Sequence, residues 1–354
     1  MSSQLTFRIV QDDIAAVDVD VVALKYAQAF YGADLWMSTK LIDLGMPKER
    51  LQPKNGEYAL IESRGAIHAP DVLFVGTPHL RHFGYEQISE FCTRTLAVLA
   101  RERPRVRSVA LTLHGVGFGL DETASFQSEL AGLNDSWASG DVPPGLETVI
   151  LVERSARRVE RLEQVLAQYI ARASNGQMLA TSDRRVATLV RPATASATHD
   201  RPHTPASPDD LGASRPTTAQ AHAFVAMPFS ETMEDIFYFG VQNPVHGAGL
   251  LCERMDHVAF TGEIIDQMKR RIETASVVVA ILTGGNPNVY LEVGYAWGKG
   301  VPAILVASSV DELAFDVKGS RCLTYTSIRD LEQKLGNELR ALQSSGNIRH
   351  ERLV

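Results

Sequence analysis

Glu292 is the residue of this chain whose type and position first suggest chemistry. On a predicted helix beginning near residue 287, it shares a stripe with apolar side chains at three- and four-residue spacing, namely Val289, Val293, Ala296 and Trp297. A carboxylate beside a core usually needs a charged partner or a catalytic task, because burial disfavours its ionised form. Glu292 is therefore a candidate for catalysis or, alternatively, for an ion pair with Arg254, Lys269 or Arg270.

The elements around Glu292 predict an open α/β sheet. Residues 276–282 (SVVVAIL) are typical of a fully buried strand. Asn286 is a plausible N-cap of the following helix, Pro287 suits its first position, and Gly300 ends it. The carboxyl end of such a strand is where open α/β sheets bind ligands.

Alternating strand and helix patterns predict two domains. The fold class is α/β, with two doubly wound, three-layer domains whose mainly parallel sheets are joined by a flexible linker. We expect a first domain at 1–175, a linker at 176–219 and a second domain at 220–346. Residues 192–218 contain five prolines and one large aliphatic residue, so they cannot form a core. Residues 174–190 form either a terminal strand or part of this linker.

The expected elements follow from apolar periodicity. Strands are expected at residues 7–10, 19–24, 58–62, 72–75, 108–113, 147–152, 223–227, 250–254, 276–282 and 303–307. Helices are expected at residues 35–44, 85–101, 122–137, 156–171, 262–275, 287–299 and 327–342.

Composition excludes several classes of protein. A 354-residue chain with a net charge of −7 lacks the concentrated basic face of a general nucleic-acid binder. The arginine-rich stretches 101–107 and 154–161 are interrupted by other residues, and we expect solvated helix ends there. Apolar runs stay well short of the ~20 residues of a membrane span. The first residues do not follow the pattern of a signal peptide, so we expect a cytoplasmic protein.

The cysteine and histidine spacings do not predict a metal site. Three widely separated cysteines suggest reduced thiols, and they are Cys92, Cys252 and Cys322. We expect surface or hydrogen-bonded histidines in the first domain, at His68, His79, His82 and His114.

The second domain resembles the nucleoside 2-deoxyribosyltransferase-like superfamily, whose fold is close to that of TIR domains. The resemblance covers roughly residues 221–340 and rests on FVAMPF at 224–229, RMD at 254–256 and NPNVYLEVGYAWGKGVP at 286–302. It implies that Glu292 is the nucleophile, or the anion that stabilises an oxocarbenium-like centre, when an N-glycosidic bond breaks. It also implies substrate-binding positions, which are Met227, Pro228, Phe229, Arg254, Asp256, Asn286, Asn288 and Tyr295.

The sequence departs from that superfamily at two positions, and these departures favour one of its reactions over another. Ile281 and Asn286 stand where related sequences carry acids that help to protonate or hold a nucleobase. Transfer of deoxyribose between bases needs such acids, whereas the nicotinamide of NAD departs without protonation. NAD glycohydrolysis is therefore favoured over base exchange.

The first domain resembles a divergent macro domain over residues 5–170. The matching features are DDI at 12–14, VDVV at 19–22, and the strand at 108–113 leading into HGVGFGLD at 114–121. In macro domains the equivalent loop binds the diphosphate of ADP-ribose, which implies phosphate contacts at Gly115, Gly117 and Gly119. The alternative is a tight turn with Asp121 as N-cap. Ala23-Leu24-Lys25-Tyr26 replaces the usual asparagines, so nucleotide binding or assembly is expected rather than removal of ADP-ribose.

Three functions follow from these patterns. The leading hypothesis is an N-glycosidase that cleaves NAD or a related nucleotide through Glu292 without a cofactor, regulated by the first domain and acting in anti-phage defence. The second is a non-catalytic sensor or scaffold for an ADP-ribose-like nucleotide, and the third is a nucleoside hydrolase or deoxyribosyltransferase. A homo-oligomer, a nucleotide ligand and a regulatory protein or second messenger are the expected partners.

Overall fold

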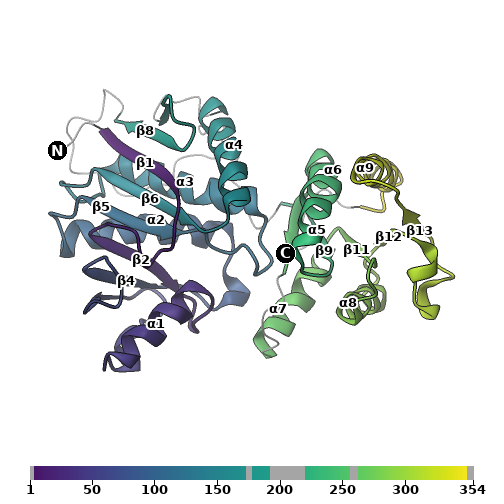
Figure 1. Cartoon of the computed structure of the whole chain (residues 1–354), viewed down its shortest axis with the longest axis horizontal. Coiled ribbons are helices and arrows are strands. Elements are labelled where there is room, and N and C mark those ends of the chain that lie inside the picture. Colours follow the sequence, from purple (N-terminus) through teal and green to yellow (C-terminus); the bar gives the residue numbers. More distant parts are fainter. Residues whose placement is uncertain (1–3, 173–177, 192–219, 256–261, 349–354) are drawn as a thin grey trace. The chain divides into compact units, whose positions relative to one another are not determined.

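The chain folds into two compact α/β units. A computed structural model describes residues 4–172, 178–191, 220–255 and 262–348. Unit 1 comprises Met1–His114 and Ser125–Pro216, and unit 2 comprises Gly115–Ala124 and Thr217–Val354. Each unit has its own mainly parallel sheet with helices packed on it, as the sequence predicts (Figure 1). The proline-rich linker at 192–218 lies outside the described residues.

The sheet of unit 1 has eight strands in the order β3-β4-β2-β5-β6-β1-β8-β7. The strands β4, β2, β5, β6 and β1 run parallel, while β3 and β8 run antiparallel to their neighbours β4 and β1. The bounds are β1 Gln4–Gln11, β2 Val21–Tyr26, β3 Tyr58–Glu62, β4 Asp71–Gly76, β5 Ser108–Thr112, β6 Thr148–Glu153, β7 Met178–Ala180 and β8 Val186–Val190.

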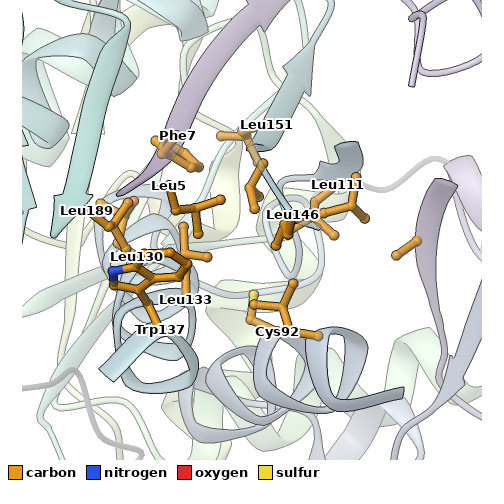
Figure 2. Packing of buried hydrophobic residues seen from close by; sticks show 14 of the residues in the cluster. Leu5, Phe7, Cys92, Leu111, Leu130, Leu133, Trp137, Leu146, Leu151 and Leu189 are labelled. Carbon is orange, nitrogen blue, oxygen red and sulfur yellow. The ribbon is translucent and has the colours of Figure 1, made fainter. Parts of the chain in front are cut away.

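Helices cover this sheet and close its core. They are α1 Ala33–Asp43, α2 Tyr85–Glu102, α3 Glu122–Ser139 and α4 Ala156–Arg172, with short 3-10 turns at Lys48–Leu51 and Leu80–His82. In β1, Leu5, Phe7 and Ile9 alternate with more exposed residues because successive side chains point to opposite faces of a sheet. Figure 2 shows two of them beside Trp137 and Leu130 of α3.

The sheet of unit 2 is parallel throughout, in the order β10-β9-β11-β12-β13. Its strands are β9 His222–Ala226, β10 Leu251–Arg254, β11 Val277–Ile281, β12 Ala303–Ala307 and β13 Cys322–Thr324. Counted along the chain this is the order 2-1-3-4-5 of a doubly wound sheet, whose topological switch point lies between its first and third strands. In unit 2 those strands are β9 and β11.

Helices lie on both faces of the unit 2 sheet (Figure 1). One face packs against α5 Glu231–Asp235, the π-helix η4 Ile236–Gln242, α6 Asn243–Gly247 and α9 Ile328–Ser344. The other packs against α7 Gly262–Glu273 and α8 Pro287–Gly298, and short 3-10 turns occupy Val310–Glu312 and Phe315–Val317. Strand β11 is buried on both faces, which explains its unbroken apolar run.

The structure adds elements that the periodicity did not predict. Residues 231–247 form three short helical segments, and the three-residue β13 is an edge strand with too few residues for a periodic signal. Residues 178–190 form the strands β7 and β8 rather than linker. The described helices include none that is both long and apolar enough to cross a membrane.

Candidate functional site

A cavity of about 400 Å³ opens in unit 1 where several parallel strands end. The ends of β1, β5 and β6 contribute to it, together with the beginnings of α1 and α4. Its lining residues are Asp12, Asp13, Ile14, Gly32, Ala33, Trp36, Thr112, Leu113, Val152, Glu153, Arg154 and Arg158. This volume and this position at the carboxyl edge are typical of ligand sites in α/β folds.

Charged side chains from the loop after β1 and from the connection between β6 and α4 form one wall. Arg154 Nη1 lies 3.8 Å from a carboxylate oxygen of Asp13, and Arg158 Nη1 lies 3.0 Å from one of Glu153. Arg158 is the more enclosed arginine, with 23% of its side chain exposed against 82% for Arg154. Both arginines lie next to the first turn of α4, where the helix dipole is positive. This wall therefore offers two guanidinium groups and a helix N-terminus to an anion.

The first turn of α1 forms another wall. Trp36 lines the cavity and keeps 41% of its surface exposed, and Lys40 Nζ lies 5.8 Å from the centre of its ring. Gly32 precedes the helix with a φ of 60°, in the left-handed region that glycine adopts readily. The indole gives this wall a flat apolar face suited to stacking against a planar ring.

The glycine-rich loop after β5 forms a tight turn in unit 2. Gly115, Gly117 and Gly119 all have positive φ, between 83° and 93°. Asp121 Oδ1 accepts a hydrogen bond from Ala124 N at 2.9 Å, so Asp121 caps α3, as the turn alternative predicts. The turn lies against Met255 and Arg271 of the same unit, and the described lining of the unit 1 cavity does not include its glycines.

Glu292 lies on the buried face of α8, with 1% of its surface exposed. Helix α8 follows β11 and packs against β9, β11 and β12, so Glu292 belongs to the layer that covers the switch point. Val289, Val293 and Ala296 are buried on the same stripe, as predicted. Trp297 is 44% exposed, contrary to the predicted stripe, because it is rotated about 100° from Ala296 around the helix axis.

Three of the predicted substrate-binding residues meet at the ends of β9 and β10. The Arg254 guanidinium lies 4.7 Å from the centre of the Phe229 ring, and its Nη1 lies 3.8 Å from Met227 Sδ. Phe237 of η4 lies on the same guanidinium at 4.0 Å. Pro228 joins Met227 to Phe229, which is 40% exposed. The cluster therefore presents an aromatic surface supported by a cation.

Three further predicted residues belong to α8 or to its N-cap. Asn286 caps the helix by accepting a hydrogen bond from Asn288 N at 2.9 Å. Tyr295 lies one turn beyond Glu292, and its hydroxyl donates to Glu273 of α7 at 2.5 Å. Asp256 lies outside the described residues.

Two of the four histidines considered in the first domain, His68 and His114, have polar partners. His68 Nδ1 lies 2.7 Å from Ala16 O, and the buried His114 Nδ1 lies 2.8 Å from Glu129. Within the described ranges, we find no group of three His, Cys, Asp or Glu side chains that could hold a metal ion.

The sequence did not identify Trp36, Arg154 and Arg158 as site residues. The sequence predicts a solvated helix end at residues 154–161, yet Arg154 and Arg158 are among the residues that line the cavity. The available signal was position, because Glu153 ends β6 and the next residues must lie at the carboxyl edge. Trp36 gave no such signal, since it lies in the first turn of α1 after β2, and the sequence does not show that this turn lies beside the ends of β1, β5 and β6.

Comparisons with known proteins gave matches to solved structures alone. No protein-family model matches the chain, and no curated protein matches it. A Trypanosoma brucei macrodomain in complex with ADP-ribose is 12% identical, with 45% of this chain and 68% of that chain covered and a TM-score of 0.34.

Two bacterial structures match at similar levels. A variant of the Oceanobacillus iheyensis macrodomain is 17% identical, with 47% and 94% covered and a TM-score of 0.36. The macrodomain of Thermus aquaticus DarG is 18% identical, with 42% and 97% covered and a TM-score of 0.32. With TM-scores below 0.5, these likenesses do not by themselves identify a ligand of this chain.

Proposed function

We propose that unit 1 binds a nucleotide of the ADP-ribose class in the cavity at the carboxyl ends of β1, β5 and β6. The observation that carries the proposal is the lining of this cavity, which combines an exposed indole, two guanidinium groups and the beginnings of two helices within about 400 Å³. A nucleotide supplies the matching parts, a planar base and anionic phosphates. This function corresponds to the second hypothesis drawn from the sequence, a sensor or scaffold for an ADP-ribose-like nucleotide.

Each part of the ligand has a proposed contact. The base would stack on Trp36, and the phosphates would lie near Arg158 and the first turn of α4. The carboxylates of Asp12 and Asp13 would accept hydrogen bonds from amino or hydroxyl groups of the ligand. Displacement of the Arg158–Glu153 ion pair would accompany phosphate binding.

Calorimetry with ADP-ribose, ADP and AMP tests this proposal. We expect saturable binding of ADP-ribose, and a loss of about tenfold or more in affinity on Trp36→Ala, since base–aromatic stacking contributes about 1–3 kcal/mol. Leu35→Ala is the matched control, because Leu35 is its exposed neighbour on α1 and is not among the lining residues. Absence of binding by the wild type, or equal losses in both variants, would contradict the proposal.

The buried Glu292 supports a second candidate function, cleavage of the N-glycosidic bond of NAD or a related nucleotide by unit 2. A carboxylate with 1% exposure on the helix that follows the switch-point strand could stabilise positive charge on a ribose better than a hydrated carboxylate does. The Met227–Phe229–Arg254 cluster would then bind the base or sugar. Unit 1 would regulate this activity, and anti-phage defence and a homo-oligomer belong to the same proposal.

A product assay on NAD and a nucleoside panel tests the second candidate. Glu292→Gln should lower the rate of NAD consumption by at least about a hundredfold. Glu338→Gln on α9 should leave this rate unchanged. Equal activity of wild type and Glu292→Gln would exclude the role of this glutamate. Base release from nucleosides without NAD loss would instead favour a nucleoside hydrolase.

A further inference from the structure

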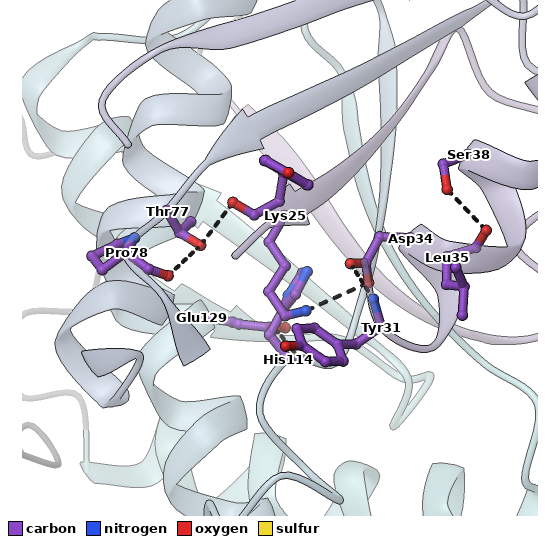
Figure 3. A network of polar contacts seen from close by, with 10 residues as sticks. Lys25, Tyr31, Asp34, Leu35, Ser38, Thr77, Pro78, His114 and Glu129 are labelled. Carbon is purple, nitrogen blue, oxygen red and sulfur yellow. Dashed lines mark hydrogen bonds and ion pairs between the residues drawn. The ribbon is translucent and has the colours of Figure 1, made fainter. Parts of the chain in front are cut away.

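A buried ion pair lies behind the α1 wall of the unit 1 cavity. Lys25 Nζ at the end of β2 is 3.4 Å from Asp34 Oδ1 in the first turn of α1, and their side chains are 5% and 6% exposed (Figure 3). Neither residue is among those that line the cavity. Lys25 belongs to the Ala23–Tyr26 segment that departs from the macro-domain pattern, so the proposed function leaves it unexplained.

Asp34 connects this pair to the loop that enters α1. Its second oxygen, Oδ2, accepts a hydrogen bond from Tyr31 N at 2.9 Å. Earlier in the loop, Gln28 has a φ of 59°, and its side chain donates to Thr77 O at 2.9 Å. A non-glycine residue in that region is held there by its surroundings. The loop is therefore fixed at both ends, by Gln28 and by Asp34.

His114 and Glu129 form a second buried pair beside Lys25. Burial lowers the pKa of His114 well below its ordinary value, and the charge of Lys25 lowers it further. Burial also raises the pKa of Glu129 well above its ordinary value. Both shifts favour the uncharged forms. The Asp34 carboxylate lies 3.4 Å from Lys25 Nζ; burial raises the pKa of Asp34, and the charge of Lys25 opposes that rise.

We propose that Lys25 and Asp34 are positioning residues that hold the first turn of α1 in the geometry needed for ligand binding. The inference rests on the proposed nucleotide site, because that turn contributes Gly32, Ala33 and Trp36 to it. Removing Lys25 leaves Asp34 buried without its cation, and a buried unpaired charge is unfavourable. Asp34 then moves or takes up a proton, its hydrogen bond to Tyr31 N weakens, and Trp36 loses its fixed position.

The first measurement needs no ligand. In a background with Trp137→Phe and Trp297→Phe, Trp36 is the single tryptophan of the chain. Lys25→Met should raise the acrylamide quenching constant of Trp36 in the folded protein. In the second measurement, by calorimetry, the same variant should bind ADP-ribose about tenfold more weakly or worse. Arg107→Met is the control, because it removes an exposed ion pair of unit 1 and should change neither value.

A double variant separates positioning from general stability. Lys25→Met with Asp34→Leu removes both buried charges, which often restores stability. It also removes the acceptor of the hydrogen bond from Tyr31 N. The raised quenching constant of Trp36 and the weak ADP-ribose binding should therefore persist while the melting temperature recovers. Recovery of binding together with stability would overturn the inference. If Lys25→Met does not fold, Asp34→Asn serves instead, because it keeps the shape of the side chain and should also raise the quenching.

The two measurements fail independently. If wild-type protein does not bind ADP-ribose, the proposed function is wrong, yet the quenching of Trp36 still reports on the α1 wall. If Lys25→Met leaves both the quenching and the affinity unchanged, the positioning role is wrong and the proposed function stands.

Discussion

The two units place their charged residues in different surroundings. In unit 1, Asp13 and Arg154 are largely exposed and lie 3.8 Å apart on one wall of a cavity. In unit 2, Glu292 is buried on α8, and Glu253 and Arg271 form an ion pair that is almost fully enclosed. Exposed pairs contribute little to stability and can exchange their partners for a ligand. Buried ones affect folding strongly, and a buried carboxylate can act on a substrate without first losing its water.

Arg271→Met should cause the largest change. Arg271 Nη1 lies 3.2 and 3.1 Å from the two carboxylate oxygens of Glu253, and His222 lies 3.4 Å from the same carboxylate. Removing the arginine leaves Glu253 buried without its cation, which should lower the free energy of unfolding of unit 2 by about 3–5 kcal/mol. Urea unfolding followed by Trp297 emission, in a background with the other two tryptophans replaced by phenylalanine, measures this change.

The control is an exposed pair of the same unit. Lys334→Met removes an i,i+4 ion pair with Asp330 on α9, and should lower the free energy of unfolding by no more than about 0.5 kcal/mol. Similar losses in the two variants would remove the contrast between buried and exposed charges.

Unit 2 should also show a pH dependence of stability from His246 and Asp121, whose Nε2 and Oδ2 atoms lie 2.6 Å apart. Burial lowers the pKa of His246, but the charge and hydrogen bond of Asp121 outweigh this effect and raise it overall. The stabilisation is therefore complete below the unfolded pKa of about 6.5 and is lost as the pH rises through the raised folded pKa. We expect a loss of about 1–2 kcal/mol over that range.

Asp121 gives the opposite dependence at low pH. Burial raises its pKa, but His246 and two backbone hydrogen bonds lower it overall. Its contribution is present above about 3.8 and is lost as the pH falls through the lowered folded pKa. Midpoints of urea unfolding measured as a function of pH test both dependences. His246→Gln should remove the loss of stability at higher pH. An unchanged profile in that variant would show that the pair is not linked to folding.

Arg158→Met should separate binding from stability in unit 1. Its ion pair with Glu153 is partly exposed, so the free energy of unfolding should fall by no more than about 1 kcal/mol. ADP-ribose affinity should fall by about tenfold, because a charge-assisted contact to phosphate is lost. Calorimetry measures this, with Arg157→Met as the control on the exposed side of α4. A large loss of stability with unchanged affinity would contradict the assigned difference between the units.

Arg154→Met should have the smallest effect. Its side chain is 82% exposed and its Nη1 lies 3.8 Å from a carboxylate oxygen of Asp13. Solvent therefore screens its interaction with Asp13 and its proposed interaction with the ligand phosphates. We expect a loss of about twofold to threefold in ADP-ribose affinity and a change in stability within about 0.5 kcal/mol. If Arg154→Met lowered ADP-ribose affinity more than Arg158→Met does, the burial of each arginine would not determine its contribution to binding.

Much of the fold could be predicted because it depends on local patterns. The buried run before Glu292 predicted β11, and the Asn286 cap, Pro287 and the Gly300 stop placed α8 within about two residues. The helical segments at 231–247 could not be predicted in the same way, because they include a π-helix whose hydrogen bonds do not follow the α-helical period. The edge strand β13 has three residues and is defined by its pairing with β12.

The sequence by itself determined the α/β class, most elements and the buried position of Glu292, since each follows from neighbours within a few turns of the chain. Only the tertiary structure decided which residues form the unit 1 cavity, because Asp13, Trp36 and Arg158 come from the loop after β1 and the first turns of α1 and α4, which the strand order brings together. It also decided that Lys25 faces Asp34 inside the unit. Such pairings depend on which strands become neighbours, and no local period of the sequence records that.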